Sequence, residues 1–232
     1  MARRSPNPQS DAFDLPAPPA RVACVPTGRH RMKQYDKAYF DRWYRHPRHR
    51  VHAPADVQRK VHCAVALAEY LLARPITSVL DIGCGEGAWE PLLRELRPRL
   101  HYQGIDPSEY AVRRFGRRRN IRLGAFADVA ALGLERDYDL VVCADVLHYV
   151  PTRDLRVGLA GLRPHVGGVA WLEAFARGDE VTGDLHGWHH RSPALYRRLF
   201  REAGLEQVGP HAYLPVELLD SLVALERAAR FG

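Results

Sequence analysis

The chain has 232 residues, of which 46% are hydrophobic and 26% are charged, as expected for a globular protein with one substantial domain. No apolar run approaches the roughly 20 residues that cross a bilayer, and no apolar stretch follows Arg3 and Arg4 to make a secretion signal. The four cysteines are scattered without paired spacing. The sequence therefore predicts a cytoplasmic protein with reduced thiols, without a membrane partner, a disulfide framework or a metal centre.

The formal charge of +7 is concentrated at the front of the chain. Residues 1–50 hold eleven Lys or Arg against four Asp, whereas residues 51–232 hold 23 charges of each sign. A neutral main domain lacks the broad basic face of a protein that modifies RNA or DNA, so a nucleic-acid partner is not favoured. The basic segment 29–50 keeps open a role in holding RNA or an acidic protein.

Residues 1–31 are rich in proline, arginine and small residues and are expected to be disordered and dispensable. Residues 32–232 then form a single domain. Residues 32–45 carry aromatic side chains at helical spacing. Two interpretations are open: a helix packed on the core, or a mobile lid with Trp43 or Tyr44 near a bound cation.

An amphipathic helix is predicted over residues 53–73, ending before Pro75, so that residues 32–75 would make a helical N-terminal lid. Arg59 lies on this helix. Its position upstream of the stretch described next makes it a candidate for the carboxylate of a bound ligand.

The stretch 78–89 organises the rest of the chain. Ser78 to Ile82 is a short apolar run that predicts a buried strand, with the carboxylate of Asp81 near its end. Glycines follow at every second position and lead into a helix, so a ligand can touch the backbone there. Free N–H groups at a helix start favour an anion, and Asp81 can receive a cationic or hydroxyl-rich group. This combination predicts a small-molecule site.

Two nucleotide-like ligands fit this stretch. Gly83-x-Gly85-x-x-Ala88 is a loose form of the dinucleotide-binding pattern, which is weak evidence alone. The fuller pattern Asp81-x-Gly83-x-Gly85-x-Gly87 resembles the first motif of class I S-adenosylmethionine-dependent methyltransferases and is more specific. The segments that follow decide between them.

Apolar runs and helical patterns alternate along the following hundred residues, which predicts a doubly wound parallel sheet with helices on both faces. Strands are expected over residues 101–106, 121–127 and 138–144, and a fifth after the helix stop and glycine turn at 164–168, up to residue 173, with helices over 89–96 and 109–119. Asp106 ends a strand 19 residues after Gly87, the interval expected for a carboxylate that binds ribose hydroxyls.

The order of these segments over residues 78–173 resembles the successive motifs of class I S-adenosylmethionine-dependent methyltransferases. A dinucleotide-dependent dehydrogenase is disfavoured, because no second domain is available and the exit loop from Ala144 to Tyr149 has no role in it. The resemblance implies a mostly parallel seven-stranded sheet with an antiparallel last strand, and S-adenosylmethionine as the cofactor. The cofactor-binding residues that it implies are Asp81, Gly83, Cys84, Gly85, Gly87, Asp106, Pro107, Asp128, Val129, Ala144, Asp145 and Leu147.

Residues 174–191 lack clear periodicity and lie where the family inserts its substrate-recognition loop. Trp188 and His190, together with Trp43 and Tyr44, are candidates for contact with the substrate. A histidine is a natural general base near neutral pH, which makes His148, His186 and His189 the catalytic candidates.

A helix is predicted over residues 194–203 and a strand over 205–209. Residues 218–231 fit either a helix or a strand, and the family's fold favours a buried antiparallel strand at 221–226. The leading hypothesis is thus methyl transfer to an oxygen or nitrogen atom of a small metabolite or natural-product intermediate. An RNA or protein methyltransferase and a non-catalytic S-adenosylmethionine-binding regulator are the alternatives, and the sequence gives neither the acceptor nor the oligomeric state.

Overall fold

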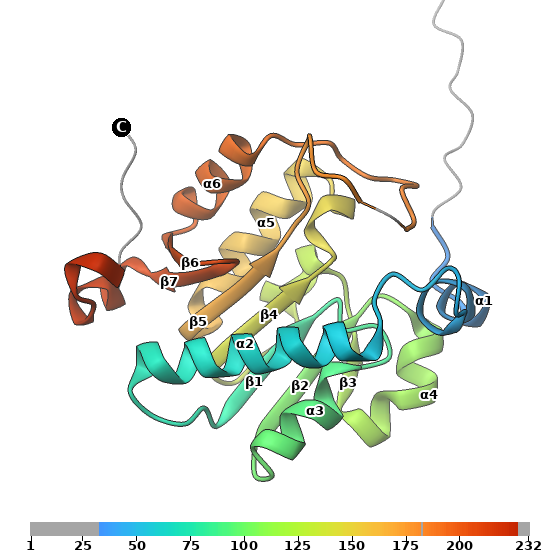
Figure 1. Ribbon diagram of the computed structural model, residues 1–232, viewed down its shortest axis with the longest axis horizontal. Helices are drawn as coiled ribbons and strands as arrows, with labels where there is room; N and C mark the ends of the chain where they lie inside the picture. The colour runs from blue at the N-terminus through green and yellow to red at the C-terminus, as the bar shows by residue number, and fades with distance from the viewer. Residues whose placement is uncertain (1–32, 182, 227–232) are drawn as a thin grey trace, which may run out of the picture. The chain divides into compact units, whose positions relative to one another are not determined.

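The computed structural model describes residues 33–181 and 183–226, so the expectations for residues 1–31 lie outside the described residues. A seven-stranded sheet is flanked by helices (Figure 1). The strands are β1 (Ser78–Ile82), β2 (His101–Asp106), β3 (Ile121–Leu123), β4 (Tyr138–Ala144), β5 (Val166–Glu173), β6 (Leu205–Gly209) and β7 (Ala212–Pro215). The α-helices are α1 (Lys37–Phe40), α2 (Pro54–Leu72), α3 (Trp89–Leu96), α4 (Glu109–Arg119), α5 (Thr152–Leu162) and α6 (Pro193–Glu202).

Shorter helical turns complete the elements. A π-helical turn, η1 (Asp41–Arg45), continues α1. The 3-10 turns are η2 (Phe126–Ala131), η3 (Leu147–Tyr149), η4 (Arg163–His165), η5 (Val216–Ser221) and η6 (Ala224–Glu226). Among the helices of the described ranges, none has both the length and the apolarity that crossing a bilayer requires.

The strand order β3-β2-β1-β4-β5-β7-β6 confirms the doubly wound fold predicted from the sequence. Strands β1 to β5 pair in parallel, and β7 pairs antiparallel with both β5 and β6. The order reverses between β1 and β4, where the connections leave in opposite directions. In open sheets of this kind, ligands bind at the carboxyl ends of the strands at this point.

Both faces of the sheet are covered, which explains why the central strands are almost continuously apolar. Val79, Leu140 and Val142 face one cluster, which includes residues of α2 and α3. Leu80 and Val141 face the other cluster, which includes residues of α5 and α6. The two helix pairs lie on opposite sides of the sheet in Figure 1. The period of two along each strand thus distributes its side chains between two cores.

The last antiparallel strand exists, but the position predicted for it is wrong. The strand is β7 at residues 212–215, whereas Val216–Ser221 and Ala224–Glu226 are 3-10 turns. A two-residue turn at Pro210 and His211, with φ of 55° at His211, reverses the chain directly after β6. The four residues of β7 are too few to show a periodicity. The remainder of the predicted segment, residues 227–231, lies outside the described residues.

Helix α2 belongs to the core rather than to a lid. Its buried face, formed by Val61, Ala64, Val65 and Ala68, packs in the cluster that covers one face of the sheet. Since α2 packs in the core, we use the name lid only for the segment before it (residues 33–52), and its movement as a lid stays a prediction.

Helix α5 approaches η2 closely through glycine. A Cβ atom on Gly158 would lie 2.1 Å from Cδ1 of Phe126 and 2.5 Å from its carbonyl oxygen. Because one of these neighbours is backbone, a side-chain rotation alone cannot make room. The glycine is therefore required by packing although it lies inside a helix.

We expect the Gly158→Ala substitution to destabilise the protein by up to about 2 kcal/mol. The overpacking cost of about 1–3 kcal/mol outweighs the helix-propensity gain of about 1 kcal/mol. Denaturant unfolding measures the change. Val157→Ala, at an exposed position on the same helix, is the control and should change stability by about 0.5 kcal/mol or less. A Gly158→Ala protein more stable than the parent would contradict this packing argument.

Candidate functional site

The loop between β1 and α3 adopts backbone conformations that favour glycine. Gly83 and Gly85 have φ of 73° and 57°, in the left-handed region that other residues rarely adopt. The N–H of Gly83 donates to the carbonyl oxygen of Ile105 at 2.7 Å, which ties the loop to β2. A Cβ on Gly83 would also lie 2.3 Å from Cγ2 of Val146. The alternating glycines thus bring the backbone close to the β4 exit.

Asp106 joins the ends of β1 and β2. One of its carboxylate oxygens accepts from the N–H of Gly85 at 2.7 Å, and the other accepts from the N–H of Ser108 at 2.8 Å. The side chain is buried, and this burial raises its pKa although the two N–H donors oppose the shift. Each oxygen keeps a second lone pair for a ligand hydroxyl. The geometry suits a carboxylate that binds a diol.

One cavity opens at the carboxyl ends of the strands, at the edge where the lid and the loop after β5 also lie (Figure 1). Its lining residues are Tyr35, Tyr39, Phe40, Tyr44, Gly83, Gly85, Asp106, Pro107, Asp145, Val146 and Tyr149. The cavity volume is about 60 Å³, enough for a few waters. Pockets for drug-sized ligands measure about 300–1,000 Å³, so a nucleoside needs the lid side chains to move.

The π-helical turn decides which lid aromatics face this cavity. Its i→i+5 geometry, closed by the His46 N–H to the Asp41 carbonyl at 2.9 Å, brings Tyr44 within 6.3 Å of Tyr39. An uninterrupted α-helix would have paired Tyr39 with Trp43 instead. Trp43 stacks on the guanidinium of Arg42 at 4.8 Å and does not line the cavity.

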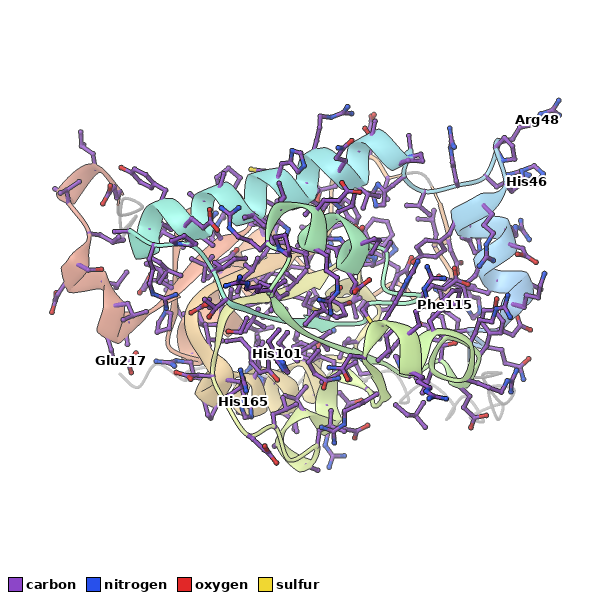
Figure 2. All side chains as sticks on the ribbon, turned by 90° about the horizontal axis from the view of Figure 1, so that it is seen from below. His46, Arg48, His101, Phe115, His165 and Glu217 are labelled. Carbon is purple, nitrogen blue, oxygen red and sulfur yellow. The ribbon has the colours of Figure 1, made fainter. Side chains whose placement is uncertain are left out.

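The lid is fixed to the two loops that it covers. A ring carbon of Phe40 lies 3.1 Å from the position of a Cβ on Gly85, so this glycine also makes room for the lid. Arg45 pairs with Glu86 in the glycine loop, and the Ser108 hydroxyl donates to the carbonyl of Tyr35. Beyond η1 the chain turns outward, where His46 and Arg48 project away from the sheet (Figure 2).

A charged network lies beside the cavity at the ends of β4 and β5. His52 Nε2 lies 2.6 Å from Asp145 Oδ2, and Lys60 Nζ lies 3.2 Å from Asp145 and 2.7 Å from Glu173. Burial acts to raise the pKa of Asp145, but His52 and Lys60 outweigh it and lower the pKa to about 2. Asp145 therefore stays anionic. Its Oδ1 is buried without a hydrogen-bond partner among the described residues.

His148 lies under a cover of aromatic rings. It is 3% exposed, and its ring lies 4.2 Å from Tyr149, 5.3 Å from Phe175 and 5.6 Å from Trp188. Burial lowers the pKa of His148 to about 4, so the imidazole is neutral at neutral pH. Nδ1 of His148 and Nε1 of Trp188 are buried without hydrogen-bond partners in the described part of the chain. Two polar atoms are thus available to a group that enters beneath the loop.

Several predicted cofactor residues lie away from the cavity. Arg59 is exposed and pairs with Asp56, so its proposed contact with a ligand carboxylate is not supported. Asp128 caps its own turn by accepting from Ala125, while Val129 is fully buried in the core. Leu147 is likewise buried, which leaves its side chain unavailable to a ligand.

Asp81 and Cys84 turn toward β2. The Tyr102 hydroxyl donates to Asp81 at 2.9 Å, and burial raises the pKa of Asp81 to about 7. The thiol of Cys84 packs over Gly104. Gly87 packs against Ile121, and Ala144 packs with the core, so the cavity lining excludes these four predicted residues.

The loop histidines occupy exposed positions. His186 and His189 are exposed, and like His148 they are not among the residues that line the cavity, so a catalytic role for them stays a prediction. His190 is exposed and stacks on Trp188 at 4.6 Å. Within residues 33–181 and 183–226, no group of three or more His, Cys, Asp or Glu side chains could hold a metal ion.

The sequence did not indicate several residues that build the site. Tyr35 and Tyr39 belong to an aromatic run whose orientation the sequence leaves open, and the π-helical turn that brings Tyr44 beside Tyr39 has no sequence signature. His52 and Lys60 meet Asp145 and Glu173 across long sequence separations, which a single sequence does not reveal. Val146 could have been found, because it directly follows Asp145 in the predicted exit loop.

Comparisons with known proteins agree with this geometry. The family model described as a methyltransferase domain matches residues 36–210. Comparison with curated protein sequences gives no match.

Solved structures share the fold at low sequence identity. DesVI from Streptomyces venezuelae is 20% identical, with a TM-score of 0.52 over 69% of this chain and 92% of its own. A putative sarcosine dimethylglycine methyltransferase from Galdieria sulphuraria is 17% identical, with a TM-score of 0.51 over 65% and 62%. A SAM-dependent methyltransferase from Leishmania major is 18% identical, with a TM-score of 0.50 over 66% and 64%.

The glycine loop and Asp106 fit S-adenosylmethionine, since the glycines without Cβ atoms let a ligand approach the backbone and the carboxylate beside them suits a ribose diol, all on one cavity. The family match covers most of the chain and includes every strand of the parallel part of the sheet. The chain therefore belongs to the methyltransferase-domain family and is a class I enzyme that uses S-adenosylmethionine.

Proposed function

We propose that the enzyme methylates an oxygen or nitrogen atom of a small molecule. The observation that carries this proposal is the cavity under the lid, where the lid tyrosines and the glycine loop line one space with Asp106 and Asp145. An acceptor must fit under the lid, which favours a small molecule over a folded polymer. Phe40 and the Arg45–Glu86 pair hold that lid on the cofactor loop.

The chain's own residues align the donor and the acceptor. Gly83 and Gly85 leave room for the donor against the loop backbone, Asp106 binds the ribose hydroxyls, and Asp145 faces the cationic part of the donor. When bound, S-adenosylmethionine supplies a methyl carbon activated by its sulfonium. The lid excludes water and fixes the line of attack.

His148 is the general base in this proposal. Its imidazole is neutral at neutral pH and Nδ1 is without a partner among the described residues, so it can accept a hydrogen bond from the acceptor. Burial is what lowers its pKa, so opening of the loop above it would rehydrate the ring and restore the basicity that proton transfer needs. Trp188 covers His148, and its indole N–H, which has no partner among the residues that the structure describes, would donate to the acceptor atom. Access requires the loop at residues 174–191 to move, because Trp188 and Phe175 lie over the imidazole.

A second candidate function, the binding of RNA, is favoured by one observation. Arg113, Arg114, Arg117 and Arg118 are exposed on one face of α4 and have no ion-pair partner within the described ranges. In the predicted segment 29–50, by contrast, Lys37 and Arg45 are paired with Asp41. Although residues 51–232 have no net charge, the exposed arginines of α4 form a local basic face.

The leading function is tested by assaying methyl transfer from labelled S-adenosylmethionine to a fractionated metabolite extract. We expect Asp106→Ala to weaken cofactor affinity at least tenfold, because it removes the ribose partner. His148→Asn should lower turnover about 100-fold with little change in cofactor affinity. Arg59→Ala is the matched control and should leave both unchanged. A parent protein that binds no S-adenosylmethionine would refute the proposal, and unchanged turnover in His148→Asn would remove the base.

The buried neutral histidine also predicts how stability depends on pH. Because the pKa of His148 is about 4 in the fold and about 6.5 in the unfolded chain, the unfolded state binds more protons between these values. Stability should therefore fall as pH drops from 6.5 to 4, with about 3 kcal/mol due to His148. Urea unfolding of the parent and of His148→Asn measures the difference. Parallel pH profiles would show that His148 is not protected from protonation.

The RNA alternative predicts salt-sensitive binding. If the four α4 arginines each neutralise one phosphate, log Kd for single-stranded RNA should change with log salt concentration with a slope of about 3. Replacing all four by glutamine should abolish this slope. Replacement of Arg197, Arg198 and Arg201 on α6 by glutamine is the control, because α6 lies far from α4 (Figure 1). Binding that is absent or independent of salt would exclude this function.

A further inference from the structure

The ammonium group of Lys33 lies inside a cage of aromatic rings. Its Nζ is 3.6 Å from the centroid of the Tyr149 ring, 5.3 Å from that of Tyr39 and 5.4 Å from that of Tyr35. The carboxylate of Asp184 closes the cage at 2.7 Å from Nζ. The side chains of Lys33 and Asp184 are only 15% and 13% exposed, so water reaches this pair poorly.

Three segments far apart in the sequence build this cage. Tyr35 and Tyr39 come from the lid, Tyr149 from η3 after β4, and Asp184 from the loop after β5. The Tyr149 hydroxyl donates to the Asp184 carbonyl, which fixes the third ring against the acidic residue. Burial raises the pKa of Tyr35 to about 12, so its ring stays neutral and offers a π face to a cation.

This arrangement has the chemistry of an ammonium receptor. A cation within about 6 Å of several aromatic centroids, with a carboxylate beside it, is how proteins bind alkylammonium groups. Lys33 gives up most of its hydration there, and burial lowers its pKa more than Asp184 raises it. A lysine that only held the lid in place would need the ion pair with Asp184 but not the contacts with three aromatic rings.

The cage also belongs to the cavity of the cofactor loop. Tyr35, Tyr39 and Tyr149 line the same space as Gly83 and Asp145. A ligand ammonium in the cage would therefore lie in the space that the methyl donor enters. Lys33 and such a ligand would compete for one position, and the lysine has the advantage of being tethered to the chain.

We propose that Tyr35, Tyr39, Tyr149 and Asp184 recognise the ammonium group of an amine substrate, and that Lys33 occupies this site until the substrate displaces it. The proposal rests on the proposed small-molecule methyl transfer and narrows its substrate class to aliphatic amines. The bound ammonium must lose one proton, to His148 or to water, before the nitrogen lone pair can form the bond to the methyl carbon as the carbon–sulfur bond breaks. It also makes Lys33 an internal competitor that keeps the lid closed over the cavity. The recognition itself does not require the methyl donor, so it can be measured alone.

The test compares n-butylammonium with its neutral analogue n-butanol by isothermal titration calorimetry, without S-adenosylmethionine and at constant ionic strength. Lys33→Met removes the internal cation and keeps the chain length. We expect this variant to bind n-butylammonium about tenfold more tightly than the parent, because the cage is no longer occupied. n-Butanol should show no such gain. Adding Tyr149→Leu to Lys33→Met should abolish the gain.

Lys37→Met is the matched control, because Lys37 is exposed on α1 and pairs with Asp41 outside the cage. It should bind n-butylammonium as the parent does. Near-ultraviolet circular dichroism verifies that each variant is folded, and Lys33→Gln replaces Lys33→Met if the latter is not. Equal affinity of the parent and the Lys33 variant, or an equal gain for n-butanol, would overturn the proposal.

Separate measurements distinguish this proposal from the proposed function. Cofactor affinity and methyl transfer to n-butylamine are assayed on the same variants. If the protein binds no S-adenosylmethionine but Lys33→Met still binds n-butylammonium more tightly than the parent, the proposed function is refuted and the ammonium site is supported. If methyl transfer occurs only to neutral alcohols and Lys33→Met binds n-butylammonium no more tightly than the parent, the ammonium site is refuted and the proposed function is supported.

Discussion

The bond between the Gly85 N–H and the Asp106 carboxylate is the constraint on which the site depends. It closes the glycine loop onto the end of β2, and the Ser108 N–H holds the other carboxylate oxygen. With the loop fixed in this way, Phe40 can pack on Gly85 and place the lid. Cofactor recognition and the position of the lid therefore depend on the same hydrogen bond, so that its loss would affect both.

The parallel part of the fold follows from local patterns in the sequence. The run from Ser78 to Ile82 and the glycines after it are a strand, a turn and a helix start because buried parallel strands are apolar throughout and glycine tolerates positive φ. Asp106 could be placed by its interval from Gly87. Such signals lie within a few residues of each other, which is why a single sequence reveals them.

The parts of the site that the sequence did not reveal depend on contacts between distant segments. Lys60 is an ordinary residue of an amphipathic helix until the fold brings it between Asp145 and Glu173. Arg59, one residue earlier, is exposed instead. The two side chains differ only in their position around the helix, since neighbouring residues point in different directions. Short elements such as β7 at residues 212–215 were missed for a different reason, because four residues carry too little pattern.

The π-helical turn of the lid has a consequence for how this enzyme class could diversify. One extra residue in the turn places Tyr44 beside Tyr39 and leaves Trp43 stacked on Arg42. Deleting one residue from this turn would restore ordinary helical phase and exchange which aromatic side chains meet the ligand. A change in the length of the lid would then alter substrate selectivity although every residue that lines the rest of the cavity stayed the same.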